Sequence, residues 1–329
     1  MNFKPIAIDD YRILKPFFAG HHYSLCVYSP ASLIAWSFRS FKAYYRIEEG
    51  KLFIAGEMEE GDILLQGVPP NSTMPHRGVD GDTMRHHVPI RHLILPLAQE
   101  RLPSPAELHR YAEKMGFERY WCVPADYMER LDRSELEALF VTEEQKGYED
   151  YIYLTEDLIH LKGNKYSKKR NLINQFTREY LRKGRVEVEE IHSKDVAECL
   201  QFLDIWCEQH DCDADPESDL ACEKNAVITA LENMERLEWK GLLIRVDGRV
   251  SAFGIGARLN ETTATLNFEK ADSGIKGLYQ FLDNECAKRL FHQFRYLNKE
   301  SDMNLPNLAE SKQSYNPVLR IKSYALTLR

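Results

Sequence analysis

Residues 239–291 decide the fold, and they read WKGLLIRVDGRVSAFGIGARLNETTATLNFEKADSGIKGLYQFLDNECAKRLF. Asp247-Gly248 lies between two β-rich runs and is a strong signal for a hairpin turn. A third β-rich run follows at 263–272, and the stretch 274–291 has the pattern of a helix. This segment therefore predicts three antiparallel strands that lead directly into a helix.

The rest of the chain extends this pattern. In the second half we expect helices in 155–163 and 164–184, from about Asp195 and through 221–237, and then a strand, a short helix and a strand in 295–328. The first half predicts a hairpin in 43–57, strands in 62–68 and 92–98, a loop in 69–91, and a helix from Ser104 to Gly116 with a Glu107 capping box. We expect an α+β chain of two domains, 1–140 and 141–329, in which mixed, mainly antiparallel sheets are flanked by helices.

Composition and charge favour a soluble, cytoplasmic protein. The 329 residues are 43% hydrophobic and 29% charged, which is enough to build two cores. The longest apolar runs, such as 92–98, fall far short of the ~18–20 residues that span a bilayer. Acids at Asp9 and Asp10 interrupt the N-terminus before a signal peptide could develop. No integral membrane association is therefore expected.

Seven scattered cysteines without a secretory signal argue against a disulfide framework. One cluster, Cys207, His210, Cys212 and Cys222, holds four possible zinc ligands, but no second CxxC-like pair completes a usual pattern. Cys207 also fits the apolar face of one helix, so buried thiols are the preferred interpretation. No metal is expected.

A basic segment is the strongest physical signal outside the hairpin. Residues 162–185 hold nine Lys or Arg and one acid, Glu179, in a chain whose net charge is −8. Such segregation is what an electrostatic site for a polyanion requires, and interleaved polar side chains can also donate to phosphate. A solvated helix face is the alternative. The residues of this segment that we expect to bind phosphate are Lys162, Lys165, Lys168, Lys169, Arg170 and Asn171.

The order of elements in the second half is similar to the GNAT fold of N-acetyltransferases. In that fold a central antiparallel meander feeds a helix whose N-terminus receives a pyrophosphate through backbone N–H groups and the helix dipole. The corresponding stretch here is 272–279, so the resemblance implies phosphate contacts at Lys276 and Gly277. Its glycines lack the usual Arg/Gln-x-x-Gly-x-Gly/Ala spacing, and the alternative is that they only shape a turn.

Three segments carry a closer resemblance: 150–176, 267–288 and 296–318 look like the C-terminal catalytic domain of phosphatidylglycerol lysyltransferases. That family implies two GNAT-like units in tandem and an aminoacyl-tRNA donor, as in the peptidoglycan-bridge Fem transferases. The unit 1–140 would then be degenerate, and 141–329 would carry the active site. The chain has no transmembrane bundle like that of the membrane enzymes, so a lipid acceptor is not implied.

Glu269 and Tyr315 are the predicted catalytic residues. Glu269 lies near the end of a central strand, where a carboxylate can act as general base. Tyr315 matches, by order, the tyrosine that protonates the leaving group in acetyltransferases of this fold. The alternatives are an ion pair of Glu269 with Lys276 or Lys299, and a tyrosine that only packs at a turn. The predicted pocket residues are Asn267, Lys270, Tyr279, Gln280, Asn284, Asn298, Glu300 and Lys312.

The resemblance implies the donor class and the residues supply a cationic groove with candidate acid–base groups, so we expect an acyltransferase that moves an aminoacyl group from aminoacyl-tRNA to an amine or hydroxyl of a small-molecule, lipid or peptide acceptor. No cofactor is expected, because tRNA or coenzyme A carries the acyl group as substrate. No nucleophile motif with a base beside it is present, so direct transfer is expected. Two alternatives stay open: a non-catalytic protein that binds RNA or another anionic ligand, and a coenzyme A-dependent N-acetyltransferase.

Overall fold

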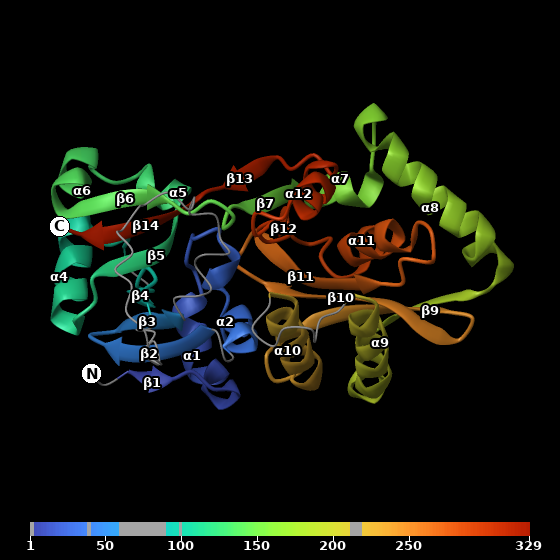
Figure 1. Cartoon of the computed structure of the whole chain (residues 1–329), viewed down its shortest axis with the longest axis horizontal. Helices are drawn as coiled ribbons and strands as arrows, with labels where there is room; N and C mark the ends of the chain where they lie inside the picture. Colours follow the sequence, from blue (N-terminus) through green and yellow to red (C-terminus); the bar gives the residue numbers. More distant parts are fainter. Residues whose placement is uncertain (1–2, 38–40, 59–89, 99–100, 211–218) are drawn as a thin grey trace, which may run out of the picture.

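The structure is a computed structural model that describes residues 3–37, 41–58, 90–98, 101–210 and 219–329. These residues form two mixed sheets that lie side by side, each flanked by helices (Figure 1). Sheet A has the order β1 (Lys4–Pro5), β2 (Phe41–Glu48), β3 (Lys51–Met58), β4 (Ile90–Leu93), β5 (Arg119–Pro124), β14 (Ser323–Leu328), β6 (Phe140–Glu144). Sheet B has the order β13 (Leu319–Ile321), β7 (Asp150–Leu154), β12 (Tyr296–Asn298), β11 (Thr263–Ala271), β10 (Arg249–Arg258), β9 (Lys240–Val246), β8 (Val186–Glu190). The predicted α+β class, with two mixed sheets each flanked by helices, is confirmed.

The two sheets exchange a strand. β7 follows β6 of sheet A in the chain, yet it lies in sheet B between β12 and β13. β14 follows β13 of sheet B, yet it lies in sheet A between β5 and β6. Each exchanged strand pairs antiparallel with both of its neighbours. The sheets therefore do not divide the chain into 1–140 and 141–329, because Phe140–Glu144 and Ser323–Leu328 complete the first sheet.

The hairpin in sheet B forms as the sequence predicts. Asp247 and Gly248 take positive φ angles of 52° and 76° at the turn between β9 and β10. Gly254, in the middle of β10, lets α11 (Leu278–Arg289) approach closely, because a Cβ there would lie 2.6 Å from Cys286 Sγ. The three-strand meander and the helix after it are thus one packed unit.

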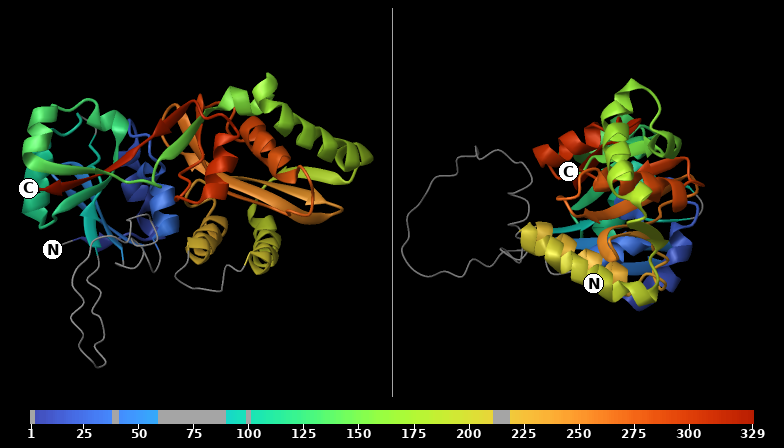
Figure 2. Two further views of the ribbon diagram at one scale, coloured as in Figure 1. Left: turned by 45° about the horizontal axis from the view of Figure 1, so that its top comes forward. Right: turned by 90° about the vertical axis from the view of Figure 1, so that its right-hand side faces the viewer.

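Helices cover both faces of sheet B. One face carries α7 (Thr155–His160), α8 (Ser167–Glu179), α11 and α12 (Pro306–Gln313), and the other carries α9 (Val196–Gln209) and α10 (Asp219–Glu232) (Figure 1). Two further views show α8 reaching the end of the molecule that lies away from sheet A (Figure 2). α8 therefore starts beside α7 and extends away from the first unit.

The first unit contains α1 (Tyr11–Phe18), α2 (Pro30–Trp36), α4 (Pro105–Met115), α5 (Ala125–Met128) and α6 (Arg133–Leu139). The predicted capping box is present at the start of α4, where Glu107 N–H donates to Ser104 Oγ (3.3 Å) and Ser104 N–H donates to Glu107 Oε2 (2.9 Å). α2 packs against α10, and one apolar core joins residues of both units. The strand predicted at 62–68 and most of the loop predicted at 69–91 lie outside the described residues.

The exchange predicts that the two sheets lose stability together. Leu326→Ala removes a fully buried side chain from β14 and should lower the free energy of unfolding by about 2–5 kcal/mol. Amide exchange should then accelerate in β5 of sheet A and in β11 of sheet B alike. The half-exposed Leu319 of β13 supplies the control, since Leu319→Ala should change little. Unchanged protection of β11 in Leu326→Ala would show that the sheets unfold independently.

Candidate active site

The site forms where β11 and β12 diverge. These strands pair in parallel over three residue pairs only, from Thr263↔Tyr296 to Thr265↔Asn298. Past Asn298 the chain turns away, and Glu300 has a left-handed backbone with φ +57°. β11 continues to Ala271 beside β10. Side chains from the surrounding elements fill the space between the diverging strands.

An ionic cluster occupies this divergence. Lys299 Nζ lies 2.7 Å from Glu269 Oε2 and 3.0 Å from Asp283 Oδ1 of α11. The side chains of Lys299 and Asp283 are 10% and 3% exposed, whereas that of Glu269 keeps 18%. Of the two ion-pair partners considered for Glu269, Lys299 is the one observed. The polar run Asp283-Asn284-Glu285 in the middle of the predicted helix is the sequence signal for Asp283, which the prediction missed.

Tyr315 lies in the same cluster, just after α12. Its ring is buried, and Lys169 Nζ of α8 lies 3.8 Å from the ring centroid, with Lys299 Nζ at 5.0 Å. Tyr153 of β7 meets the ring edge-on at 6.5 Å. The negative potential of the ring face stabilises both ammonium groups. The structure thus brings together Glu269, Tyr315 and Lys169, which were predicted from separate segments.

Burial and charge tune the titration of this cluster. Burial raises the pKa of Glu269 and the Lys299 ammonium opposes it, which leaves a pKa of about 6. Burial lowers the pKa of Lys169 to about 8. Burial, followed by the carboxylates of Asp283 and Glu269, raises the pKa of Tyr315 well above its usual value. At neutral pH the cluster thus offers a carboxylate that can accept a proton and a phenol that retains one.

Three predicted pocket residues join the cluster to the first unit. Asn267 Nδ2 donates to Glu300 Oε1 (2.6 Å) and to Ser32 Oγ of α2 (3.1 Å). Asn298 Nδ2 donates to Asp150 Oδ2 of β7 (2.7 Å). Burial raises the pKa of Glu300 to about 8, although Lys312 lowers it. Asn267 therefore bonds directly to α2, Asn298 also donates to the carbonyl of Ser24 in the first unit (3.0 Å), and Glu300 accepts from Asn267 beside the cluster.

Lys312 and Asn284, two further predicted pocket residues, bind backbone carbonyls. Lys312 Nζ donates to the carbonyl of Lys299 (2.6 Å) and to that of Ser301. Asn284 Nδ2 donates to the carbonyls of Leu158 (2.6 Å) and Ile159 at the end of α7. These contacts fix the backbone on both sides of the ionic cluster.

Lys270 and Tyr279 are tied to α9 instead. Lys270 Nζ pairs with Glu223 Oε2 of α10 (2.7 Å) and lies 4.0 Å from the ring centroid of Trp206. Trp206 Nε1 donates to the Tyr279 hydroxyl (3.1 Å). Gln280 is half-buried in the first turn of α11. Since neighbouring residues of a strand alternate faces, Lys270 points away from Glu269 and lies outside the cluster.

The basic segment divides between two faces of α8. Lys165 pairs with Asp157 (3.2 Å), and Arg170 donates to the carbonyls of Leu161 and Gly163 (2.6 Å to the latter), so both hold the end of α7. Lys169 turns inward to Tyr315, and Lys162 is exposed ahead of the helix. The exposed face carries side chains that can donate hydrogen bonds, namely Lys168, Asn171, Asn174 and Arg178, and its one acidic neighbour is Glu179, which lies 3.5 Å from Arg178. We call this face the α8 stripe.

The predicted phosphate position at Gly277 is covered by α8. Gly277 has φ +87°, and a Cβ there would lie 2.2 Å from the carbonyl oxygen of Leu172. The glycine is therefore required for the close approach of α8 to the N-terminus of α11. Lys276 beside it is exposed.

A substitution separates this packing role from simple backbone strain. Gly277→Ala forces the α8 backbone to move and should lower the free energy of unfolding by at least about 3 kcal/mol, which exceeds the ~1–2 kcal/mol of left-handed strain alone. Gly184→Ala is the matched control, since Gly184 also has a positive φ (69°) and nothing lies within 4 Å of a Cβ there. Chemical denaturation measures both. Equal losses in the two variants would refute the close approach.

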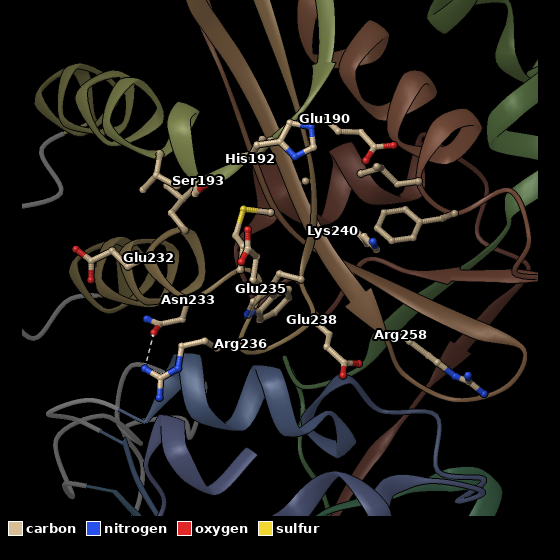
Figure 3. A pocket seen from close by; sticks show the side chains of 18 of the residues that line it. Glu190, His192, Ser193, Glu232, Asn233, Glu235, Arg236, Glu238, Lys240 and Arg258 are labelled. Atoms are coloured by element: carbon tan, nitrogen blue, oxygen red, sulfur yellow. Dashed lines mark hydrogen bonds between the residues drawn. The ribbon is translucent and has the colours of Figure 1, made fainter. Parts of the chain in front are cut away.

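A cavity of about 750 Å³ lies elsewhere, at the start of β9 and the end of β10 (Figure 3). Its floor includes buried Ile191, Trp239 and Phe291, and its rim carries exposed charged side chains such as Glu190, Glu235 and Lys240. The predicted site residues do not line it. It is therefore distinct from the cluster.

The described residues also bear on the metal and membrane predictions. Among them, no group of three or more His, Cys, Asp or Glu side chains could hold a metal ion. Cys207 is buried and His210 stacks on Trp206 with centroids 3.9 Å apart, while Cys212 lies outside the described residues. In the part of the chain that is described, the helices are too short or too polar to cross a bilayer.

Comparisons with known proteins show what the whole chain resembles. The family model described as phosphatidylglycerol lysyltransferase, C-terminal, matches residues 104–327. A solved structure of a conserved protein of unknown function from Bacteroides thetaiotaomicron VPI-5482 is 27% identical, with 100% of each chain covered and a TM-score of 0.79. A curated relative, the uncharacterized protein MYCGA3080 of Mycoplasmoides gallisepticum, is 22% identical over 304 residues, or 90% of each chain.

A second solved structure shares the fold at lower identity. It is the C-terminal domain (DUF2156) of an Agrobacterium fabrum protein named as a lysylphosphatidylglycerol synthetase, 13% identical, with 97% of this chain and 91% of that chain covered and a TM-score of 0.61. Family and fold together support an acyltransferase of the GNAT type. With more than half of its residues matched by the family model, the chain belongs to the phosphatidylglycerol lysyltransferase C-terminal family.

Proposed function

We propose that this protein transfers an aminoacyl group from aminoacyl-tRNA to an amine or hydroxyl acceptor, with the donor held on α8 and the reaction at the ionic cluster. One observation carries the proposal. α8 extends Lys169 into the cluster on one side and displays the α8 stripe on the other. A polyanion bound along the stripe would therefore have its reactive end close to Glu269 and Tyr315.

The stripe has the chemistry that a phosphate backbone requires. Lys168 and Arg178 supply positive charge, and Asn171 and Asn174 supply amide donors between them. The exposed Arg182 and Lys183 extend the charge beyond the end of the helix. Charged and amide donors along one line bind phosphates whatever the nucleotide sequence, as an enzyme that binds the stem of a tRNA requires.

The cluster supplies the groups that acyl transfer needs. The carboxylate of Glu269 takes the proton of the acceptor amine or hydroxyl as the acceptor attacks the ester carbonyl. The Lys169 ammonium faces the negative charge that develops on the carbonyl oxygen. As the ester C–O bond breaks, Tyr315 gives its proton to the ribose oxygen, and the proton held by Glu269 then restores the phenol through water. One proton passes from acceptor to leaving group, and a new C–N or C–O bond replaces the ester.

Direct transfer fits the chemistry of the nearest thiol. Cys286 is fully buried, and burial raises its pKa well above the usual value. A thiol that stays protonated is a poor nucleophile. An aminoacyl ester is already activated, so positioning and acid–base help suffice.

A coenzyme A donor is the second candidate, and the packing at Gly277 disfavours it. The backbone of α8 covers the side of the α11 N-terminus where the resemblance to acetyltransferases implies a pyrophosphate. A non-catalytic RNA-binding protein remains the third candidate. It would use the stripe but not the tuned acid–base groups.

The stripe gives a direct binding prediction. Lys168→Ala, Arg178→Ala and Lys183→Ala together should weaken the binding of unfractionated tRNA and reduce its salt slope by about 2–3, since each lost contact removes roughly 0.9 counterion for a duplex. The matched control removes three other exposed cations, Arg12, Lys42 and Lys194, and should leave both quantities unchanged. Titrations at several salt concentrations measure the slope.

The binding result also separates the candidates. Equal losses in the stripe and control variants would mean that binding depends on net charge alone and would remove the proposed donor site. Tight binding of coenzyme A, unaffected by the stripe substitutions, would favour the acetyltransferase instead.

The role of Tyr315 predicts a specific kinetic loss. Hydroxylamine can replace the unknown acceptor, and the hydroxamate formed from aminoacyl-tRNA then reports the rate. Tyr315→Phe keeps the ring beneath Lys169 but removes the acid, so the maximal rate should fall by ~10²–10⁴ while tRNA affinity stays constant. Tyr296→Phe on β12 is the control and should be silent. Full activity in Tyr315→Phe would assign the leaving-group proton to another source.

A further inference from the structure

We propose that Lys299 is a positioning residue for this site, whose ammonium bridges Glu269 and Asp283 across the β11–β12 divergence and keeps the base ionised and aimed at the reacting groups. The catalytic role of Lys299 rests on the proposed function. The ionisation of the Glu269 carboxyl, which Lys299 controls, can be measured without any substrate.

The position of Lys299 in the fold makes the bridge possible. It is the first residue past the last β11–β12 pair, so its side chain spans the point where the strands separate. Its ammonium is 2.7 Å from one carboxylate and 3.0 Å from the other. A shorter side chain at this position would leave the two acids facing each other.

The backbone of Lys299 is held from two sides, which orders its long side chain. Its N–H donates to the carbonyl of Tyr151 on β7 (3.0 Å), and its carbonyl accepts from Lys312 Nζ (2.6 Å). Holding a surface lysine in one rotamer costs conformational entropy. Here the anchored backbone and the burial of Lys299 already limit the rotamers of its side chain. The exchanged strand β7 therefore helps to position the ammonium of Lys299.

The charges around Glu269 show why one ammonium matters. Two carboxylates, Glu269 and Asp283, face two ammonium groups, Lys299 and Lys169. The other titratable groups that face Glu269 are Cys286 and Tyr279 of α11, Lys312 of α12, Tyr315, and Tyr153 of β7. Without Lys299, a buried pair of carboxylates would share the half-buried Lys169, and like charges in a site of low polarity favour protonation.

The pKa directions agree with the geometry. Burial by itself would lower the pKa of Lys299, but Asp283 and Glu269 raise it well above its usual value, so the ammonium stays charged. Burial raises the pKa of Glu269, and Lys299 is the largest influence that opposes this rise. Loss of Lys299 should therefore move the pKa of Glu269 further upward, which removes the base at neutral pH.

The test is a carboxyl titration by NMR on protein with ¹³C-labelled glutamate, with the Glu269 resonance identified by its absence in Glu269→Gln. We expect a midpoint near pH 6 in the wild type and a rise of about one pH unit or more in Lys299→Met. Lys299→Arg keeps a charge at the bridge and should retain a midpoint near that of the wild type. An unchanged or lower midpoint in Lys299→Met would overturn the inference, because a merely structural lysine would not set the ionisation of Glu269.

A second pair of variants covers the case in which Lys299→Met does not fold. Asp283→Asn removes the opposing carboxylate, so Lys299→Met in that background no longer leaves two acids together. The midpoint of Glu269 should still rise by about one unit between Asp283→Asn and the double variant. No rise there would overturn the inference equally.

The proposed function is tested separately by the hydroxamate rate. If the wild type is active, the acid limb of its rate–pH profile should move upward in Lys299→Met by the same amount as the NMR midpoint. An inactive wild type with a shifted midpoint would refute aminoacyl transfer and leave the ion-pair role of Lys299 standing. A shifted midpoint with an unmoved acid limb would refute Glu269 as the base that Lys299 serves.

Discussion

The exchange of β7 and β14 is the constraint on which the rest of the structure depends. Because β7 enters sheet B between β12 and β13, Tyr153 reaches the ring of Tyr315, and Asp150 reaches Asn298. The return of β14 to sheet A fixes the path of the chain after Tyr315. The junction beside the cluster is therefore built by both units, through Asn267 and Asn298, whereas the residues of the cluster come from the second unit. A separate C-terminal domain cut at residue 140 would lack part of its surroundings.

Burying these charges costs desolvation free energy, which argues for a role beyond stability. The attraction within a buried ion pair offsets the cost of its desolvation only when the geometry is good, and replacing such a pair by apolar side chains often stabilises a protein. Here the pairs of Lys299 are short, and Lys169 lies over an aromatic ring. Buried acids and amines with shifted pKa values gather at functional sites more often than elsewhere. The helix that carries Lys169 also carries the exposed stripe, so one element connects surface charge with buried chemistry.

Local signals in the sequence predicted most elements correctly. The Asp247-Gly248 hairpin, the capped helix that ends at Gly116 and the strand–helix–strand order after residue 295 are all observed, because each depends on residues close in the chain. The expected last strand is broken in two at Lys322, and its second part crosses to the other sheet. Strand pairing between distant segments has no local signal, so the exchange and the domain division could not be read from composition.

The candidate site was predicted in part for the same reason. Glu269 and Tyr315 followed from their order in the fold, but their neighbours Asp283 and Lys299 depend on the divergence of two strands, which only the structure reveals. The basic segment was recognised as a whole. Its division into an inward lysine, two residues that hold α7 and an exposed stripe depends on which face of α8 meets α11. Gly277 is a phosphate-binding candidate by sequence, but the carbonyl of Leu172 occupies the space of a Cβ there, which gives the glycine a packing role.

The most direct test is a structure of the protein with an acceptor-stem minihelix that carries a non-hydrolysable, amide-linked amino acid. We expect the stem to lie along Lys168, Asn171 and Arg178, and the aminoacyl carbonyl to lie within about 3–3.5 Å of the Tyr315 hydroxyl, as near-attack geometry requires. A minihelix bound elsewhere, for example with its aminoacyl end in the cavity beside Trp239 and no contact to the ionic cluster, would contradict a reaction at Glu269 and Tyr315.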